Sequence, residues 1–196
     1  MIKIRKRSQP VKKSKKIKHT IHRNKNIIIG ILIIFLLIII GFYVFVILNE
    51  PNESNGDDFT FTSVDGDELR LSNYRGKIII LDMWATWCRP CRSQMIELKK
   101  IYDIYPNKDL EIISIDVDTS ETINQIRDFI NSFKVQEGIE LNWIFGKDDG
   151  NIWEKYKMAN EGIPTLCIFD QDGNLYYQDE GAKDSGLLSQ KIEDLL

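Results

Sequence analysis

The longest apolar stretch of the chain runs from Ile27 to Leu48. It holds 22 residues without a charged side chain and is broken only by Gly30 and Gly41. A helix of this length, at about 1.5 Å per residue, spans roughly 33 Å and can cross a hydrocarbon core of about 30 Å. The alternative, a buried core helix, would need protein around it on every side. We therefore expect a transmembrane anchor helix over residues 27–48.

The end of this stretch bears on whether the segment is removed after export. A cleavable signal peptide has an apolar core of about 7–15 residues, followed by small residues at a cleavage site. Here the stretch is longer and ends in Val46-Ile47-Leu48-Asn49-Glu50, which offers no such site. The pattern predicts an anchor that is not cleaved.

Beyond the anchor, residues 49–58 are polar, contain Pro and Gly, and are typical of a short flexible linker. Residues 59–196 then show strand and helix periodicities in turn. The expected elements are a hairpin of strands at 59–63 and 68–71, a buried strand at 78–81, a helix at 89–105, a strand at 110–117, a helix from Thr119 or Ser120 to Phe133, a strand at 141–145, a helix at 151–158, hairpin strands at 166–169 and 175–178, and a closing helix at 185–196. This order predicts an α/β fold in which helices flank both faces of a central mixed sheet.

Charge is distributed very unevenly along the chain. Residues 1–26 hold eleven Lys or Arg and no acid, whereas all 29 acids and the other 15 bases follow the anchor. Lys and Arg are retained on the cytoplasmic side of a membrane span. We therefore expect a cytoplasmic tail at 1–26 and an extracytoplasmic domain at 59–196, held at the cell membrane by one span. The basic tail could also suggest nucleic-acid binding, but topology and anionic lipid headgroups already explain it.

Two cysteines, Cys88 and Cys91, lie where a buried strand gives way to an amphipathic helix. A sulfur at a helix N-terminus faces unpaired amide N–H groups and the positive end of the dipole, which favour thiolate. Arg89 and Arg92 add positive charge, and Pro90 is tolerated in a first helical turn. Two thiols at this spacing can meet, so one can attack a disulfide and the other can resolve the mixed disulfide.

Other uses of the cysteines fit the sequence less well. A zinc site needs about four ligands, and beyond this pair the outer part offers Cys167 and no histidine, because His19 and His22 both lie in the tail. We therefore expect no metal. The missing histidine also argues against Cys–His proteases and Ser–His–Asp hydrolases. A purely structural disulfide would close so small a loop that it would add little stability. An inert pair of buried thiols is disfavoured by the flanking arginines.

The segment Leu81-Asp82-Met83-Trp84-Ala85-Thr86-Trp87-Cys88-Arg89-Pro90-Cys91 resembles the active-site segment of the thioredoxin superfamily, and is most similar to its TlpA/ResA branch of membrane-tethered thiol–disulfide oxidoreductases. Gly162-Ile163-Pro164-Thr165 resembles the loop that carries the cis-proline of the superfamily. Phe169-Asp170-Gln171-Asp172-Gly173 resembles the hairpin that follows it. The resemblance covers about residues 57–196 and implies a thioredoxin-like fold with an N-terminal hairpin.

The resemblance also implies roles for individual residues. Cys88 would be the exposed nucleophile and Cys91 the buried resolving thiol, with no cofactor besides their disulfide. Pro164 would be the cis-proline facing the sulfurs, in a loop with Ile163 and Thr165 that pairs with an extended substrate. Trp87 would shield the dithiol, with Arg89 and Pro90 beside it at the substrate, although Trp87 could instead be a packing aromatic.

Three further positions bear on the chemistry. Asp82 matches an acid that in thioredoxin helps to move the proton of the buried thiol; the alternative is an acid at the strand end that reaches solvent. Burial would raise the pKa of such an acid toward the working range. Gln94 stands where ResA-like proteins carry Glu, and an amide cannot relay a proton as a carboxylate can. Cys167, between apolar neighbours in a strand, is expected to be a buried and inert thiol.

These observations favour a thiol–disulfide oxidoreductase that acts on protein disulfides outside the membrane. Disulfides persist in that compartment, so a reductase there needs a membrane electron-transfer partner. Maturation of cytochrome c and general redox homeostasis are candidate tasks implied by the resemblance. The alternatives are a disulfide-forming oxidant or isomerase, a peroxide reductase, and a non-catalytic membrane-tethered binding or chaperone module. Arg89 favours an oxidising pair and Asp82 a reducing one, and their balance does not follow from the residues. The resemblance implies a reductase.

Overall fold

The computed structural model describes residues 15–48, 56–105 and 109–196. The chain divides into two units between Glu53 and Ser54, and each is described by itself. Residues 1–14 of the predicted tail and residues 49–55 of the predicted linker lie outside the described residues.

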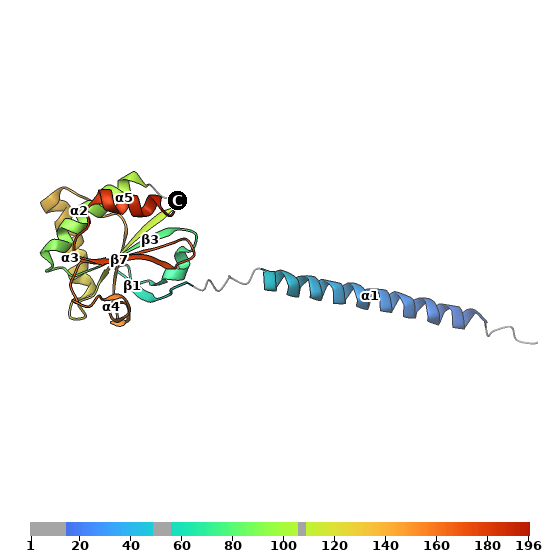
Figure 1. The fold of residues 1–196 in the computed structure, drawn as a ribbon. Helices are drawn as coiled ribbons and strands as arrows, with labels where there is room; N and C mark the ends of the chain where they lie inside the picture. The colour runs from blue at the N-terminus through green and yellow to red at the C-terminus, as the bar shows by residue number, and fades with distance from the viewer. Residues whose placement is uncertain (1–14, 49–55, 106–108) are drawn as a thin grey trace, which may run out of the picture. The chain divides into compact units, whose positions relative to one another are not determined.

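The first unit contains one long helix, α1 (Lys15–Leu48) (Figure 1). It begins at Lys15, whereas the apolar stretch begins at residue 27. From Ile27 to Val44 every residue is exposed apart from the partly exposed Gly30. The stretch is long and apolar enough to cross a membrane.

The second unit is built on one mixed sheet of seven strands in the order β2-β1-β5-β4-β3-β6-β7. The strands are β1 (Thr60–Ser63), β2 (Glu68–Arg70), β3 (Ile78–Trp84), β4 (Leu110–Asp116), β5 (Ile144–Lys147), β6 (Thr165–Phe169) and β7 (Leu175–Glu180). β3, β4 and β5 run parallel, while β6 and β1 pair antiparallel at the two sides of this group. The expected hairpins are present as β1–β2 and β6–β7.

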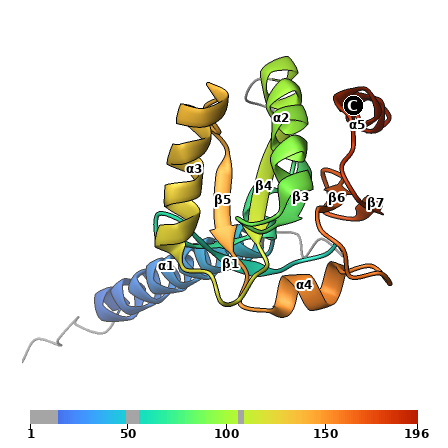
Figure 2. The ribbon, with the colours of Figure 1, turned by 90° about the vertical axis from the view of Figure 1, so that its left-hand side faces the viewer.

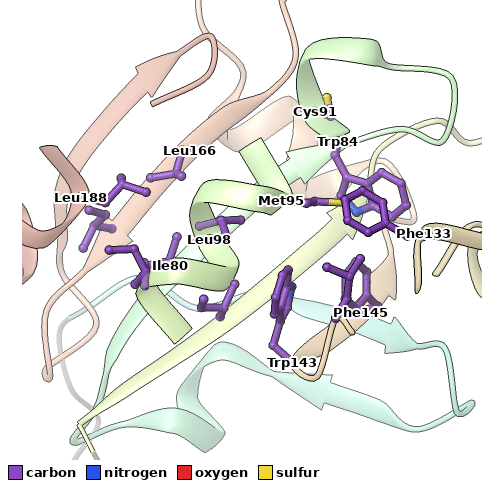
Figure 3. Packing of buried hydrophobic residues seen from close by; sticks show 14 of the residues in the cluster. Ile80, Trp84, Cys91, Met95, Leu98, Phe133, Trp143, Phe145, Leu166 and Leu188 are labelled. Atoms are coloured by element: carbon purple, nitrogen blue, oxygen red, sulfur yellow. The ribbon is translucent and has the colours of Figure 1, made fainter. Parts of the chain in front are cut away.

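Helices cover both faces of the sheet (Figure 2). One face packs against α2 (Arg89–Ile104), α3 (Ile123–Glu137) and α5 (Ser185–Glu193), and the other against α4 (Asn151–Tyr156) and the short 3-10 helix η1 (Leu71–Tyr74). Successive side chains of β3 alternate between these two cores, so every residue of the strand is buried. In Figure 3, Ile80 and Trp84 of β3 lie in one cluster with Met95 and Leu98 of α2.

Several boundaries differ from the expectation, each for a local reason. β3 continues past residue 81 to Trp84, because its pairing with β4 persists through Trp84 and Asp116. α3 is capped by Thr122, whose side chain accepts the Gln125 amide, rather than by Thr119 or Ser120. The same helix runs beyond Phe133 to Glu137, and Gly138 caps its C-terminus in the left-handed conformation, with a φ of 69°.

Other boundaries also move. β5 lies at 144–147 rather than 141–145, and β7 extends to Glu180. α4 ends at Tyr156 and α5 at Glu193, earlier than expected. Helix ends fray and sequence periodicity locates them poorly, so shifts of this size are ordinary.

The close approach of β1 and β5 depends on Gly146. A Cβ built there would lie 2.6 Å from the Phe61 ring and 2.9 Å from the Thr62 carbonyl oxygen. We expect Gly146→Ala to lower the free energy of unfolding of this unit by about 1–3 kcal/mol, as overpacking does. Urea denaturation followed by tryptophan fluorescence measures the loss, because all four tryptophans belong to this unit. Val135→Ala, on an exposed site of α3, is the control and should change stability little; equal effects of both substitutions would contradict the prediction.

Candidate functional site

Cys88 and Cys91 form a disulfide at the start of α2, with an S–S distance of 1.99 Å. Cys88 is the N-cap residue of the helix, and its sulfur accepts the backbone N–H of Cys91 at 3.2 Å. In this disulfide Cys88 is only 3% exposed and Cys91 is fully buried, so the expectation of an exposed Cys88 is wrong, while that of a buried Cys91 is confirmed. The buried strand β3 delivers the chain to this point, and the amide of Cys88 donates to the carbonyl of Ala85 at 3.1 Å. In the reduced pair the Cys91 N–H and the helix dipole would stabilise a thiolate on Cys88.

The loop before β6 faces this disulfide. The peptide bond between Ile163 and Pro164 is cis, in agreement with the resemblance noted from sequence. The sulfur of Cys88 lies 3.7 Å from the carbonyl oxygen of Ile163. The carbonyl of Pro164 accepts the Gly181 amide at 2.7 Å, and the hydroxyl of Thr165 donates to Gly162 at 2.6 Å. The backbone of Ile163 is therefore the part of this loop that lies beside the sulfur.

The side chain of Trp87 is 67% exposed, so it is not a core residue. Its indole N–H donates to Asp118 at 2.8 Å. Together with Trp153 and Ile163 it lines a hollow that the acids Asp118 and Glu161 also line.

The residues between and after the two cysteines point in different directions. Arg89 and Pro90 are exposed at the start of α2. Arg92 instead turns toward α3, where its guanidinium pairs with Glu137 at 3.0 Å and lies over the ring of Phe133. The expectation that both arginines add charge at the sulfurs therefore needs correction, since the charge of Arg92 is compensated by an acid of α3.

Asp82 is fully buried in β3, on the sheet face that α2 covers. This excludes the alternative of an acid that reaches solvent. Burial raises the pKa of Asp82 to about 7, while a hydrogen bond from Ser114 at 3.0 Å acts in the opposite direction. The Ser114 hydroxyl in turn accepts the indole N–H of Trp143 at 2.9 Å. The second carboxyl oxygen, Oδ1, is buried without a hydrogen-bond partner.

Gln94 is buried one turn into α2 and makes a two-sided contact with Lys183. Its Oε1 accepts the Lys183 amide at 2.6 Å and its Nε2 donates to the Lys183 carbonyl at 3.3 Å. A carboxylate could accept from the amide but could not donate to the carbonyl. Gln94 therefore joins α2 to the connection between β7 and α5.

Several residues beside the site were not singled out from sequence. Ser114 and Trp143 surround Asp82, and Glu121 and Asp116 lie beneath Thr86, which comes just before Trp87. Asp116 carries only a weak signal, since it is an acid at the end of a strand that also holds Glu111 and Ser114. Ser114 and Trp143 give no such signal, because only the pairing of β3 with β4 and the packing of the sheet bring them to Asp82.

The remaining cysteine lies away from the disulfide. Cys167 is buried in β6 within the opposite core, and burial raises the pKa of its thiol to about 12. The thiol is therefore protonated at neutral pH. Among the residues that the structure describes, no three His, Cys, Asp or Glu side chains gather in a way that could hold a metal ion.

A disulfide at the start of a helix, facing a cis-proline loop in a sheet of this topology, defines a thioredoxin-like thiol–disulfide oxidoreductase. The chain belongs to the AhpC/TSA family, whose model matches residues 54–178. It is 25% identical over 138 residues to the thiol-disulfide oxidoreductase ResA of Bacillus thuringiensis subsp. konkukian, covering 70% of this chain and 75% of that protein. The ResA of Oceanobacillus iheyensis is 27% identical over 173 residues, covering 82% and 85% of the two chains.

Solved structures give the same fold. The crystal structure of StoA from Bacillus subtilis superposes with a TM-score of 0.56 at 22% sequence identity, covering 70% of this chain and 98% of that one. The predicted fold class, the thioredoxin-like enzyme class and the relation to ResA-like proteins are thus confirmed.

The raised pKa of Asp82 predicts a pH-dependent stability. The folded-state value of about 7 lies above the ordinary value of 3.8, so folding takes up a proton between these values. The stabilisation of the protonated carboxyl is complete below about pH 4 and is lost as the pH rises through about 7. Asp82→Asn, which cannot ionise, should gain stability relative to the unsubstituted protein across this window, at about 1.4 kcal/mol per pH unit.

Denaturant unfolding of the oxidised protein at a series of pH values measures this difference. Asp128→Asn, which removes an exposed acid of α3, is the matched control and should show a constant difference. A constant difference for Asp82→Asn as well would contradict the raised pKa.

Proposed function

We propose that this chain reduces disulfides of proteins at the outer face of the cell membrane, with α1 as its single membrane anchor. The observation that carries the proposal is the position of Cys88. Its sulfur caps the N-terminus of α2 and lies 3.7 Å from the carbonyl oxygen of Ile163. A substrate segment lying along that loop would bring its own disulfide to this sulfur.

The orientation in the membrane rests on the charge pattern. The eleven basic residues of segment 1–26 favour the cytoplasm, and the acidic segment 59–196 then lies outside. We propose domain boundaries at residues 1–26, 27–48, 49–58 and 59–196 accordingly. A domain on that side meets proteins whose disulfides persist.

The reaction is a thiol–disulfide exchange in two steps. The thiolate of reduced Cys88 attacks one sulfur of a substrate disulfide, forms a mixed disulfide and releases the other substrate sulfur as a thiolate. The thiolate of Cys91 then attacks the Cys88 sulfur, which closes the Cys88–Cys91 disulfide and releases the second substrate sulfur. Two electrons pass from the enzyme to the substrate, and the two released thiolates take up protons. No cofactor besides the two sulfurs takes part.

Asp82 is the proposed acceptor of the Cys91 proton. The carboxyl and the thiol belong to the same face of the sheet, and the free Oδ1 of Asp82 is an available acceptor. A pKa of about 7 suits a group that must take and return a proton at neutral pH. Gln94 cannot share this task, since an amide does not titrate.

Substrate contacts are assigned to the surface around Cys88. Trp87, Arg89 and Pro90 are exposed on its helix side, whereas on the loop side Ile163 is partly exposed and Pro164 and Thr165 are buried. Because the carbonyl of Pro164 already accepts the Gly181 amide, we assign pairing with an extended substrate to the backbone of Ile163. The ring of Pro164 would support this loop from the buried side.

The reducing direction is supported by the charges near the sulfurs. A positive group beside the thiolate stabilises the reduced form and makes a pair more oxidising. Arg92 does not act in this way, because Glu137 compensates its charge, and Arg89 is exposed to solvent that screens it. Electrons must then reach the pair from a dithiol protein in the membrane, since α1 carries no redox group.

The reduction potential tests the direction. The full-length protein in detergent is equilibrated with a dithiol redox buffer, and tryptophan fluorescence reports the oxidised fraction. We expect a value near that of thioredoxin, about −270 mV. A value near that of DsbA, about −120 mV, would contradict the reductase and favour a disulfide-forming oxidant.

Cysteine variants test the chemistry. Cys88→Ser should abolish reduction of a disulfide-bonded protein substrate, because the attacking sulfur is gone. Cys91→Ser should accumulate the mixed disulfide, detected by mass spectrometry, because resolution fails. Cys167→Ser is the matched control and should retain full activity, since that thiol lies buried in the opposite core.

These variants also separate the other candidate functions. A non-catalytic binding module would keep its function in Cys88→Ser. If the chain were a peroxide reductase, the reduced protein alone would consume hydrogen peroxide at a measurable rate. Either outcome would replace the proposed reductase.

A further inference from the structure

Thr86 and Trp87, the two residues before Cys88, donate hydrogen bonds to acids of the loop between β4 and α3. Glu121, which is 7% exposed, accepts the backbone N–H of Thr86 at 3.0 Å and also accepts the Thr86 hydroxyl. Asp118 accepts the indole N–H of Trp87. The path of the chain into the helix start is therefore set by carboxylates.

A third acid, Asp116, lies on the buried side of this contact. Asp116, the last residue of β4, is fully buried; its Oδ1 accepts the Asp118 amide at 2.8 Å and its Oδ2 receives no N–H or O–H donor. The charge of the Glu121 carboxyl acts on that of Asp116. A fully buried carboxyl oxygen that receives no donor is costly when ionised, so we expect Asp116 to carry a proton, which it can donate to Glu121.

The surroundings place the proton on Asp116. Burial, and then the hydrogen bond and charge of Glu121, raise the pKa of Asp116 to about 8. Burial acts upward on Glu121 as well, but the hydrogen bonds from Asp116 and Thr86 outweigh it and lower the pKa of Glu121. Glu121 therefore stays ionised and accepts from Thr86, while Asp116 donates to it.

Other charged groups near Asp116 do not remove the need for this proton. Lys147 lies opposite it on β5, and its ammonium donates to the Asp118 carbonyl at 2.9 Å. The amide of Asp148 donates to the Asp116 carbonyl, while the Asp148 carboxylate accepts from the first turn of α4. On the β3 side the partner in register is the uncharged Trp84.

We propose that Asp116 and Glu121 are positioning residues that share one proton, and that this proton fixes the segment from Thr86 to Cys88. When it leaves, two negative charges face each other in a buried site, and Glu121 moves away from its partner. Thr86 then loses its two acceptors, and the approach to Cys88 loosens. The inference goes beyond the proposed reductase, because it holds for either direction of disulfide exchange.

The sign of the effect follows from proton linkage. The folded-state pKa of Asp116 lies above the ordinary value of 3.8, so the folded chain binds the proton more tightly than the unfolded chain. The stabilisation is complete below about pH 4 and is lost as the pH rises through about 8. The segment before Cys88 should therefore be ordered in neutral solution and loosen in alkaline solution.

Hydrogen exchange of the Thr86 amide reports this event directly. We would measure its protection factor by NMR in the oxidised full-length protein in detergent, from about pH 6 to about pH 9. Neither Cys88 nor Cys91 titrates in the disulfide, so neither confuses the profile. We expect protection to fall roughly tenfold as Asp116 ionises.

Substitutions identify the group responsible. Asp116→Asn keeps an N–H donor toward Glu121 but cannot ionise, so the protection of Thr86 should become independent of pH. Glu121→Gln also removes the charge pair and decides the question should Asp116→Asn fail to fold. Asp82→Asn is the control, since it removes the other buried acid of this face and should leave the loss of protection in place.

Reactivity gives a second readout. The rate at which the reduced protein attacks a small aromatic disulfide should show an alkaline inflection beyond the ionisation of Cys88, and Asp116→Asn should remove that inflection. Constant Thr86 protection in the unsubstituted protein, or an unchanged alkaline loss in a folded Asp116→Asn or Glu121→Gln variant, would overturn the inference. Because exchange in the oxidised protein needs no turnover, this result stands apart from failure of the reductase assay.

Discussion

The burial of β3 on both faces is the constraint on which the site depends. Each residue from Ile78 to Trp84 is buried, and the strand is paired on one side with β4 and on the other with β6. Pairing in register with both neighbours prevents the strand from sliding along its own axis, so the position of its last residue is fixed. The chain leaves the sheet at Ala85, turns through Thr86 and Trp87, and starts α2 at Cys88. The polarity of a helix N-terminus is thereby directed at one sulfur.

Burial within the sheet also explains the raised pKa values of two acids near the site. Asp82 and Asp116 lie on the face covered by α2 and α3, opposite Ser114 and Trp84 in the register of β3 with β4. Removal from water raises the pKa of each carboxyl into the neutral to alkaline range. An acid that is protonated in the fold weakens stability as the pH rises, so both positions cost stability at neutral pH. Groups with this property are commonly found where proton transfer or positioning requires them.

Gln94 has a structural role in this chain. Its amide both donates to and accepts from the backbone of Lys183, which ties the buried side of α2 to the segment before α5. Proton transfer near Cys91 is the role that we propose for Asp82. The hydrogen-bond chain from Trp143 through Ser114 orients one oxygen of that carboxyl and leaves the other free. Gln94 thus serves packing, and Asp82 is the proposed proton acceptor.

Much of this protein followed from its sequence alone. The apolar stretch 27–48, the strand and helix periodicities and the spacing of Cys88 and Cys91 are local patterns, and local patterns can be read without a structure. They gave the α/β class, and with the resemblance they gave the thioredoxin-like fold and the residues of the dithiol. The predicted helix ends were less accurate, because caps such as Thr122 compete with equally suitable neighbours.

The tertiary structure alone decided which distant residues meet. These contacts are Ser114 and Trp143 at Asp82, Asp116 and Glu121 near Thr86, and Glu137 with Arg92. Such contacts depend on strand register and helix packing, and neither is written in the spacing of residues along one chain.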